Sequence, residues 1–378
     1  MAAPAGPVSA ELTDKPSTEL TADWLRLSLT PGVGPRTGRQ LVAACGGIRK
    51  LWQRPASELK NIEGVGNKLV ATLQTSRQQE AASIIAQCSA AGITLLCPED
   101  AHYPSDLAQT DDAPLILFCR GDTSALNHSR LLAIVGARKA SSEGRLLTRR
   151  WSRHLSMRGI AIVSGMAYGI DAAAHGGALQ GEAPTLAVLG CGLAAPFSPE
   201  QQRQIEAVAA QGCMISEFLP AAEARPENFP RRNRIIAGLA VATLVVEADI
   251  RSGSLITARL AADYGRDVLA VPGSVMNGQH AGCHQLLRDG AMLVETPDDI
   301  LRCMGWHVSS GAKRVRHQAA NENEAKILAA LQDNILHIDA LTEHCDLTVP
   351  ELSPILLGLE LIGVVEALPG SRYTLGGE

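Results

Sequence analysis

A run of glycines and small polar residues, with the composition of an anion-binding turn, extends from Ser164 to His175 and reads SGMAYGIDAAAH. It follows the apolar run GIAIV, so the sequence predicts a strand, a glycine turn and the start of a helix. Such a turn presents backbone N–H groups at a helix N-terminus, where anions bind. The candidate anions are a dinucleotide, a nucleotide to be hydrolysed and the backbone of a polynucleotide.

Other predicted strands also end in small residues, in GARKASSEG, GCG, EADIRSGSLITA and VPGSVMNGQ. In an open parallel sheet these turns meet at the carboxyl edge, where ligands bind, so we expect a long anion-binding rim. The GMAYG spacing and the lack of a G-x-G-x-x-G with an acidic partner argue against NAD. No G-x-x-x-x-G-K-[ST] occurs, which argues against a P-loop ATPase. We expect no cofactor and no metal.

Arginine is abundant on this rim. Between Arg130 and Arg158 there are eight Lys/Arg and a single acid, Glu143. A second cluster, FPRRNRIIAGLA, carries Arg231, Arg232 and Arg234 around Asn233. A planar guanidinium suits phosphate oxygens and can stack on bases. We interpret Arg138 and the Arg231–Arg234 group as solvated binding residues at turns, and Arg149, Arg150 and Arg153 as a solvated helix face.

Aromatic residues make up only 3% of the chain, so those on the rim matter. Tyr168 lies in the glycine turn, Phe197 in GLAAPFSPE, and Phe229 directly before the arginines. Single-stranded nucleic acid is held by positive charge plus a few stacking platforms. Burial under the loop is the alternative for Phe229.

Asp171 and His175 are four residues apart and could form a catalytic dyad. An acid in a first helical turn more often complements the helix dipole. We therefore favour structural roles for both residues.

Apolar runs alternate with helix-like stretches between about residues 93 and 305: LLAIVG, IAIVSG, TLAVLGCG, CMISE, ATLVVEA, DVLAVPG and AMLVE. This alternation predicts an α/β fold with a Rossmann-like, doubly wound parallel sheet. The flanking regions predict an all-α N-terminal domain and a C-terminal winged helix of three helices and a hairpin. The expected domain ranges are a disordered tail, 1–18; a helical domain, 19–92; the Rossmann-like domain, 93–306; a linker, 307–322; and the winged helix, 323–378.

The helical domain contains a repeat, in which Gly32-Val33-Gly34 matches Gly64-Val65-Gly66 and each precedes an amphipathic helix. Paired helix-hairpin-helix units, which aim N–H groups at phosphate, have this pattern. A small helical bundle that uses glycine only to turn fits equally well.

The 378 residues are 46% hydrophobic and carry a net charge of −5. From Asn321 onward there are ten acids and two bases, so an acidic tail domain follows a mildly basic body. Nine cysteines without a C-x-x-C pair suggest neither zinc nor disulfides and fit a reducing cytosol. The first residues do not read as a signal peptide and no run approaches about 20 apolar residues. We expect a cytoplasmic protein.

The ordered motifs from Leu131 to about Glu295 resemble those of the DNA-processing protein A (DprA/Smf) family. They include IVGARKAS, SGMAYGIDAAAHGGAL, AVLGCGL, FPRRNRIIAGL, VVEADIRSGSLITARLAADYGRDVLAVPGS and GCHQLLRDGA. The resemblance implies a non-enzymatic homodimer that binds single-stranded DNA in a basic pocket and loads a RecA-type recombinase during natural transformation. The implicated residues are Gly136, Arg138, Ser141, Ser164, Gly165, Gly169, Arg232, Asn233 and Arg234. Rim position adds Tyr168, Phe229, Arg231, Ser252, Gly253 and Ser254.

The chain departs from the family pattern at three places. An aromatic is common where Glu143 stands, an Arg is common in place of Tyr168, and a Tyr-Pro pair is replaced by Phe197-Ser198. The missing Arg would weaken phosphate contact at this turn, whereas Tyr168 could stack on a base.

Two other functions are compatible with the residues. A nucleotide or nucleoside-phosphate hydrolase would use Asp171, Glu217 or Glu247 near the rim, and an architectural protein would bind duplex through the Gly-Val-Gly repeats. The acidic winged helix is expected to repel phosphate, which suits a protein partner or a fold-back onto the basic rim.

Overall fold

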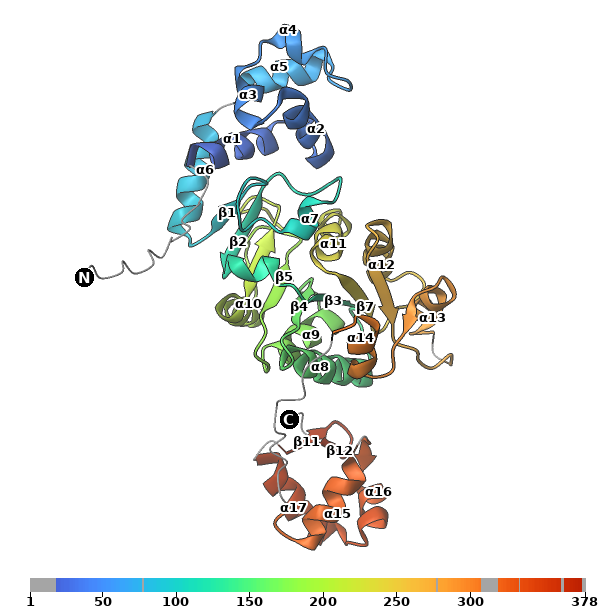
Figure 1. Cartoon of the computed structure of the whole chain (residues 1–378). Coiled ribbons are helices and arrows are strands. Elements are labelled where there is room, and N and C mark those ends of the chain that lie inside the picture. The colour runs from blue at the N-terminus through green and yellow to red at the C-terminus, as the bar shows by residue number, and fades with distance from the viewer. Residues whose placement is uncertain are drawn as a thin grey trace, which may run out of the picture. The chain divides into compact units, whose positions relative to one another are not determined.

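The computed structural model describes residues 18–76, 78–276, 278–306, 319–332, 334–361 and 364–375. The chain divides into two compact units, residues 1–306 and 307–378 (Figure 1). Of the expected disordered tail only Thr18 is described, and it opens the first helix. Most of the expected linker, residues 307–318, also lies outside the described residues.

The first part of the larger unit is helical, as predicted. Its glycine repeats have the same backbone: Gly32 and Gly64 have positive φ angles of 88° and 79°, and Gly34 and Gly66 are extended N-caps. The helices are α1 (Thr18–Leu29), α2 (Pro35–Cys45), α3 (Ile48–Gln53), α4 (Ala56–Leu59), α5 (Asn67–Thr75) and α6 (Gln78–Ala90). Contact between these turns and DNA stays a prediction.

A nine-stranded sheet follows, in the order β1-β2-β6-β5-β4-β3-β7-β8-β9. From β6 to β9 all neighbours are parallel, as predicted, whereas β1 and β2 add an antiparallel edge that the sequence did not suggest. The strands are β1 (Thr94–Leu96), β2 (Leu117–Gly121), β3 (Leu131–Val135), β4 (Ala161–Ser164), β5 (Thr185–Val188), β6 (Cys213–Ser216), β7 (Ala242–Val245), β8 (Asp267–Ala270) and β9 (Met292–Leu293).

Helices cover both faces of the sheet (Figure 1), which explains why its central strands are buried at every position. Side chains of β3 divide between the two faces: Leu132 and Ile134 pack with α8, α9 and α14, and Leu131 and Ala133 pack with α11 and α12. The helices of this part are α7 (Ser105–Ala108), η1 (Thr123–Asn127), α8 (Ser142–Ser156), α9 (Ile170–Ala178), α10 (Pro199–Gln211), α11 (Asn228–Leu239), α12 (Ser254–Asp263), α13 (Ala281–Arg288) and α14 (Pro297–Cys303).

The order of the strands reverses between β3 and β7. From β3 the chain adds β4, β5 and β6 on one side, then returns to add β7, β8 and β9 on the other. The two strands pair in parallel from Leu132–Ala242 to Val135–Val245, so the turns that follow them diverge from one point. Ligands of open α/β sheets bind in the crevice at such a switch point.

The second unit has the three helices and the hairpin expected of a winged helix. A short additional strand joins the hairpin, giving a three-stranded sheet in the order β10-β12-β11. Its core is built from Ile327, Leu341, Leu352 and Leu356, all buried. The elements are α15 (Glu322–Leu331), β10 (Leu336–His337), α16 (Ile338–Cys345), α17 (Val349–Leu361), β11 (Val365–Leu368) and β12 (Arg372–Leu375).

The described part of the chain contains no helix long and apolar enough to cross a membrane. Within the same residues, no cluster of three or more His, Cys, Asp or Glu is arranged to hold a metal ion.

Candidate functional site

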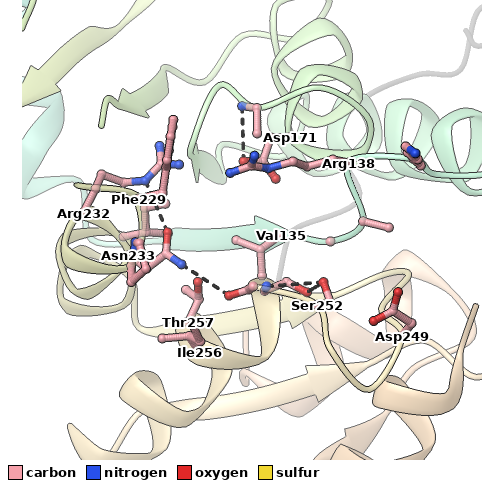
Figure 2. A pocket seen from close by; sticks show the side chains of 18 of the residues that line it. Val135, Arg138, Asp171, Phe229, Arg232, Asn233, Asp249, Ser252, Ile256 and Thr257 are labelled. Carbon is pink, nitrogen blue, oxygen red and sulfur yellow. Dashed lines mark hydrogen bonds between the residues drawn. The ribbon is translucent and has the colours of Figure 1, made fainter. Parts of the chain in front are cut away.

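A cavity of about 880 Å³ opens at the switch point, between the turns that follow β3 and β7 and the first turns of α11 and α12 (Figure 2). Eight predicted site residues line it: Gly136, Arg138, Phe229, Arg232, Asn233, Ser252, Gly253 and Ser254. The other seven lie outside its lining: Ser141, Ser164, Gly165, Tyr168, Gly169, Arg231 and Arg234. The structure therefore brings the turns after β3 and β7 together with α11, as the rim hypothesis required.

The glycine turn after β4 already holds an anion, and that anion belongs to the protein. Oδ2 of Asp171 accepts the N–H groups of Gly165 and Ala167, at 3.1 and 3.4 Å. Burial raises the pKa of Asp171, and the charge of Arg232 and these N–H donors oppose that shift. The prediction that this turn offers its N–H groups to an external phosphate is wrong for these two groups.

Gly169 fixes the turn against its neighbour. Its φ is +82°, and a Cβ there would lie 2.2 Å from the carbonyl oxygen of Ala137. The next N–H, of Ile170, donates to that same oxygen at 3.2 Å. Only glycine allows this approach, so the turn after β4 supports the turn after β3 that carries Arg138.

Arg232 is buried, with 3% of its surface exposed, although the sequence placed it at a solvated turn. It lies within α11, and its guanidinium donates to the carbonyl oxygens of Gly165 and Val188. The missing Cβ of Gly165 makes room for it, since that atom would lie 2.5 Å from Nη1. Burial lowers the pKa of Arg232 to about 10, so it stays cationic at neutral pH.

Arg234 also departs from the solvated role predicted for it. It is buried, its guanidinium forms an ion pair with Glu217, and Nη1 donates to the carbonyl oxygen of Asp112 at 2.6 Å. Arg231 is half-exposed and shares the same carboxylate, with Nε 3.3 Å from Oε1. The cluster sits in helix α11, whose apolar residues pack into the core of the sheet, and Arg232 and Arg234 are buried on different sides of this helix.

The serines position backbone elements. Ser164 is buried and donates to the carbonyl oxygen of Ile134 at 2.6 Å. Ser141 caps α8, accepting the N–H of Gly144 at 2.9 Å, and its own hydroxyl donates to Glu247 at 2.7 Å. At the start of α12 the hydroxyls of Ser252 and Ser254 bond to each other at 2.7 Å.

Asn233 links the two helices that border the cavity. Its Nδ2 donates to the carbonyl oxygen of Gly253 at 3.3 Å, and its Oδ1 accepts from Nε of Arg232 at 3.3 Å (Figure 2). Both ends of this side chain are therefore engaged within the protein.

The exposed positive charge of the cavity comes from the turn after β3. Arg138 and Lys139 are both exposed, and the Arg138 guanidinium lies 4.8 Å from the centre of the half-buried Phe229 ring. Such a cation–π contact orients the guanidinium without neutralising it. Tyr168, beside the cavity, is 68% exposed. Phe197 packs partly against an apolar core cluster instead of the cavity.

The two residues of the possible catalytic dyad do not bond to each other. Nδ1 of the buried His175 lies 2.8 Å from the Thr185 hydroxyl, which donates to the Ile162 carbonyl. Burial lowers the pKa of His175 to about 3, so the ring is neutral. Asp171 is held by the glycine turn. The structural roles that the sequence favoured for both residues agree with these contacts.

The carboxylates required by the hydrolase alternative are engaged. Glu217 pairs with Arg234 and Arg231, and Glu247 accepts both the N–H and the hydroxyl of Ser141, at 2.8 and 2.7 Å. Burial raises the pKa of Glu217 despite its arginine partners. Each of these carboxylates is therefore held by donors of the protein itself.

Sequence reasoning missed several residues of the cavity, including Lys139, Asp249 and Ile256. Lys139 was visible as the neighbour of Arg138 in the GARKAS turn. Asp249 stood out less, because the two acids of EADIRSGS, Glu247 and Asp249, give no periodic or compositional signal.

Comparison with known proteins matches two family models. Residues 94–305 match DNA recombination-mediator protein A, and residues 312–371 match the DprA winged helix domain. Protein Smf of Escherichia coli is 40% identical over 289 residues, covering 74% of this chain and 77% of that protein.

Two solved structures are similar. The X-ray structure of DNA processing protein A from Streptococcus pneumoniae has a TM-score of 0.67 at 31% identity, covering 75% of this chain and 97% of that one. The other is DNA processing protein A from Helicobacter pylori, whose structure concerns a single-stranded DNA binding mode. It has a TM-score of 0.51 at 27% identity and covers 56% of this chain and 95% of that one.

Proposed function

The chain belongs to the DNA recombination-mediator protein A family, and from this membership together with the cavity we propose that it binds single-stranded DNA at the carboxyl edge of its sheet. The bound strand would place phosphates against the turn after β3. The finer role that we propose is to protect incoming DNA and to load a RecA-type recombinase onto it, in the cytoplasm and as a homodimer.

The observation that carries the proposal is the combination of exposed cations with aromatic rings at one cavity. Arg138 and Lys139 are exposed, and Phe229 and Tyr168 supply a ring at and beside the same opening. Charge that follows a backbone, with a few stacking surfaces for bases, is the requirement for binding a single strand without strict sequence preference. A duplex keeps its bases stacked inside and cannot use those rings.

Arg232 enters this function as a positioning residue. It ties the carbonyl oxygens of β5 and of the β4 turn to α11, the helix that carries Phe229 and Asn233. Its charge contributes to the potential of the cavity from below the surface, whereas direct contact with phosphate falls to Arg138 and Lys139.

The test is a binding titration with matched single- and double-stranded oligonucleotides. We expect tighter binding to the single strand, and a log affinity that falls linearly with log salt as phosphate neutralisation releases counterions. Arg138→Ala should weaken binding for all sequences and shallow the salt slope by up to about one unit. Arg203→Ala, an exposed arginine on α10 outside the cavity lining, serves as the matched control and should change neither quantity.

Equal or tighter binding to duplex would reject the cavity as the DNA site and favour the Gly-Val-Gly repeats. Nucleotide turnover in the absence of DNA would favour the hydrolase instead. If Glu217→Gln and Glu247→Gln kept that turnover, neither carboxylate would be its catalytic group.

A further inference from the structure

The cavity proposed to receive DNA contains a free carboxylate, which a pure phosphate site would not tolerate. Asp249 lies on the loop after β7, is exposed and lines the cavity (Figure 2). Oδ1 accepts the N–H of Arg251 at 2.7 Å. Within the described part of the chain Oδ2 has no hydrogen-bond or ion-pair partner, and Oδ1 keeps a second lone pair beside the one that accepts the Arg251 N–H, so both oxygens can accept a donor from a ligand.

The backbone that carries Asp249 is fixed. The N–H of Ser252 donates to the Asp249 carbonyl oxygen at 3.1 Å, and the N–H of Gly282 donates to the Ala248 carbonyl at 2.8 Å. A Cβ on Gly282 would lie 2.6 Å from the Asp249 carbonyl oxygen, so α13 packs directly on this loop. The carboxylate is therefore held in place before any ligand arrives.

Most other polar side chains of the cavity already have partners. Asn233 bonds at both ends, Ser252 and Ser254 bond to each other, and Asp171 and Arg232 are turned into the protein. Among the described residues of the lining, the charged groups left for a ligand are the cations of Arg138 and Lys139 and the anion of Asp249. Figure 2 shows Arg138 and Asp249 well apart, on the turns that follow β3 and β7 respectively.

This separation of charge orients a nucleotide. A phosphate is attracted to the Arg138 side and repelled by Asp249, so the group that meets Asp249 must offer N–H donors. Val135, Ile236 and Ile256 also line the cavity and give it apolar surface for the face of a ring. A base that points into the cavity from a backbone at Arg138 satisfies both conditions.

The four bases differ in how well they meet a carboxylate. On its Watson–Crick edge guanine carries two adjacent donors, N1–H and the N2 amino group, which match the two oxygens of one carboxylate. Adenine and cytosine place a ring-nitrogen acceptor beside their amino group, and thymine places carbonyl oxygens on both sides of N3–H. Resting on the proposed single-strand binding, we propose that the cavity has a base subsite in which Asp249 selects guanine.

The experiment compares thymidine oligonucleotides that carry one central substitution: deoxyguanosine, deoxyinosine or thymidine. Inosine keeps N1–H and lacks the N2 amino group, so it isolates the second donor. Because a bidentate base contact discriminates by about 1–3 kcal/mol, roughly fivefold to 150-fold, we expect the guanosine oligonucleotide to bind at least about fivefold more tightly than the thymidine one. Inosine should fall between them.

Asp249→Asn keeps an oxygen for the Arg251 N–H and removes the charge. We expect it to abolish the guanine preference while binding all-thymidine DNA as well as the wild type or better. Asp263→Asn, an exposed acid at the end of α12 outside the cavity lining, is the matched control and should keep the preference.

Equal wild-type affinities for the three oligonucleotides, or a preference that survives in Asp249→Asn, would overturn the subsite. A preference that disappears with a chelator would overturn it too, because Asp249 would then act through a divalent cation. Failure to bind any of the three would instead contradict the proposed single-strand binding, so the two ideas fail in different ways.

Discussion

The Arg232→Met substitution should lower the free energy of unfolding of the larger unit much more than Arg138→Met does. Met preserves most of the side-chain volume, so the loss comes from the guanidinium. Without it, the carbonyl oxygens of Gly165 and Val188 lose their buried donor and Asp171 loses its nearby positive charge. Removing one partner of a buried charged network costs about 3–5 kcal/mol, and we expect about 4 kcal/mol here.

At an unfolding entropy of about 2.1 cal/mol/K per residue, a unit of about 300 residues shifts by roughly 1.6 °C per kcal/mol, so this loss lowers the melting temperature by roughly 6 °C. Arg138→Met, an exposed residue whose contact is the Phe229 ring, should lower it by less than about 2 °C. Thermal unfolding of the two variants and the wild type, followed by circular dichroism, is the measurement.

The loss of stability caused by Arg232→Met should become larger as the pH rises. Burial raises the pKa of Asp171 above its ordinary value, and the loss of Arg232 raises it further. The unfolded chain then releases its proton at lower pH than the folded one, so Arg232→Met loses stability as pH rises from about 4 through the folded-state pKa. Below that window Asp171 is protonated in both states and only the two carbonyls contribute. Adding Asp171→Asn should remove this pH dependence.

A melting temperature for Arg232→Met within about 2 °C of wild type, together with a loss of DNA affinity as large as that of Arg138→Met, would refute this reasoning. Arg232 would then be the solvated phosphate ligand that the sequence suggested.

Three further outcomes follow from the structure. Tyr168→Ala should weaken single-strand binding by about 1–3 kcal/mol if a base stacks on this 68% exposed ring, with an unchanged melting temperature, measured in parallel binding and melting titrations. Because the pKa of His175 is lowered to about 3, the wild type should lose up to about 1.4 kcal/mol per pH unit on acidification below about pH 6.5, and His175→Gln should flatten that dependence in urea titrations. A chain that ends near His317 loses a net charge of −8 and should bind single-stranded DNA at equal or slightly higher affinity at low salt; a large loss would show that the winged helix contacts DNA.

The sheet was predictable because its strands are continuous apolar runs separated by helix-length stretches. β3 is buried at all five of its positions, and the alternation of strands and helices in the sequence directly implied parallel pairing. The antiparallel edge was not predictable in this way. β1 has three residues and pairs with β2 at the edge of the sheet. Its formation depends on this tertiary contact, which the local sequence pattern does not indicate.

The side-chain directions in the site could not be read from residue types. The run FPRRNR looks like a basic loop, yet the apolar residues Ile235, Ile236 and Leu239 make it the first turns of a helix on the sheet. Once the helix docks by these residues, its 3.6-residue period decides which arginines face inward. Arg232 and Arg234, two residues apart, are both buried and have different partners, while Arg231 stays half-exposed.

The glycine turn has the motif of an anion site, but the motif alone does not identify the anion that is bound. A turn with two N–H groups aimed at one point binds an anion wherever it occurs, and here the buried carboxylate of Asp171 occupies that point. The glycines themselves admit protein groups: Gly165 accommodates the guanidinium of Arg232, and Gly169 the carbonyl oxygen of Ala137. The N–H groups of the turn are thus used within the protein, where they help to fix β4, α9 and α11 relative to one another. Under the proposed function an external phosphate binds one turn along the sheet edge, at Arg138 and Lys139, whose charges have no internal anion to neutralise them among the described contacts. For that reason we assign the phosphate contact to side chains at the switch point and the positioning of that switch point to the glycine turn.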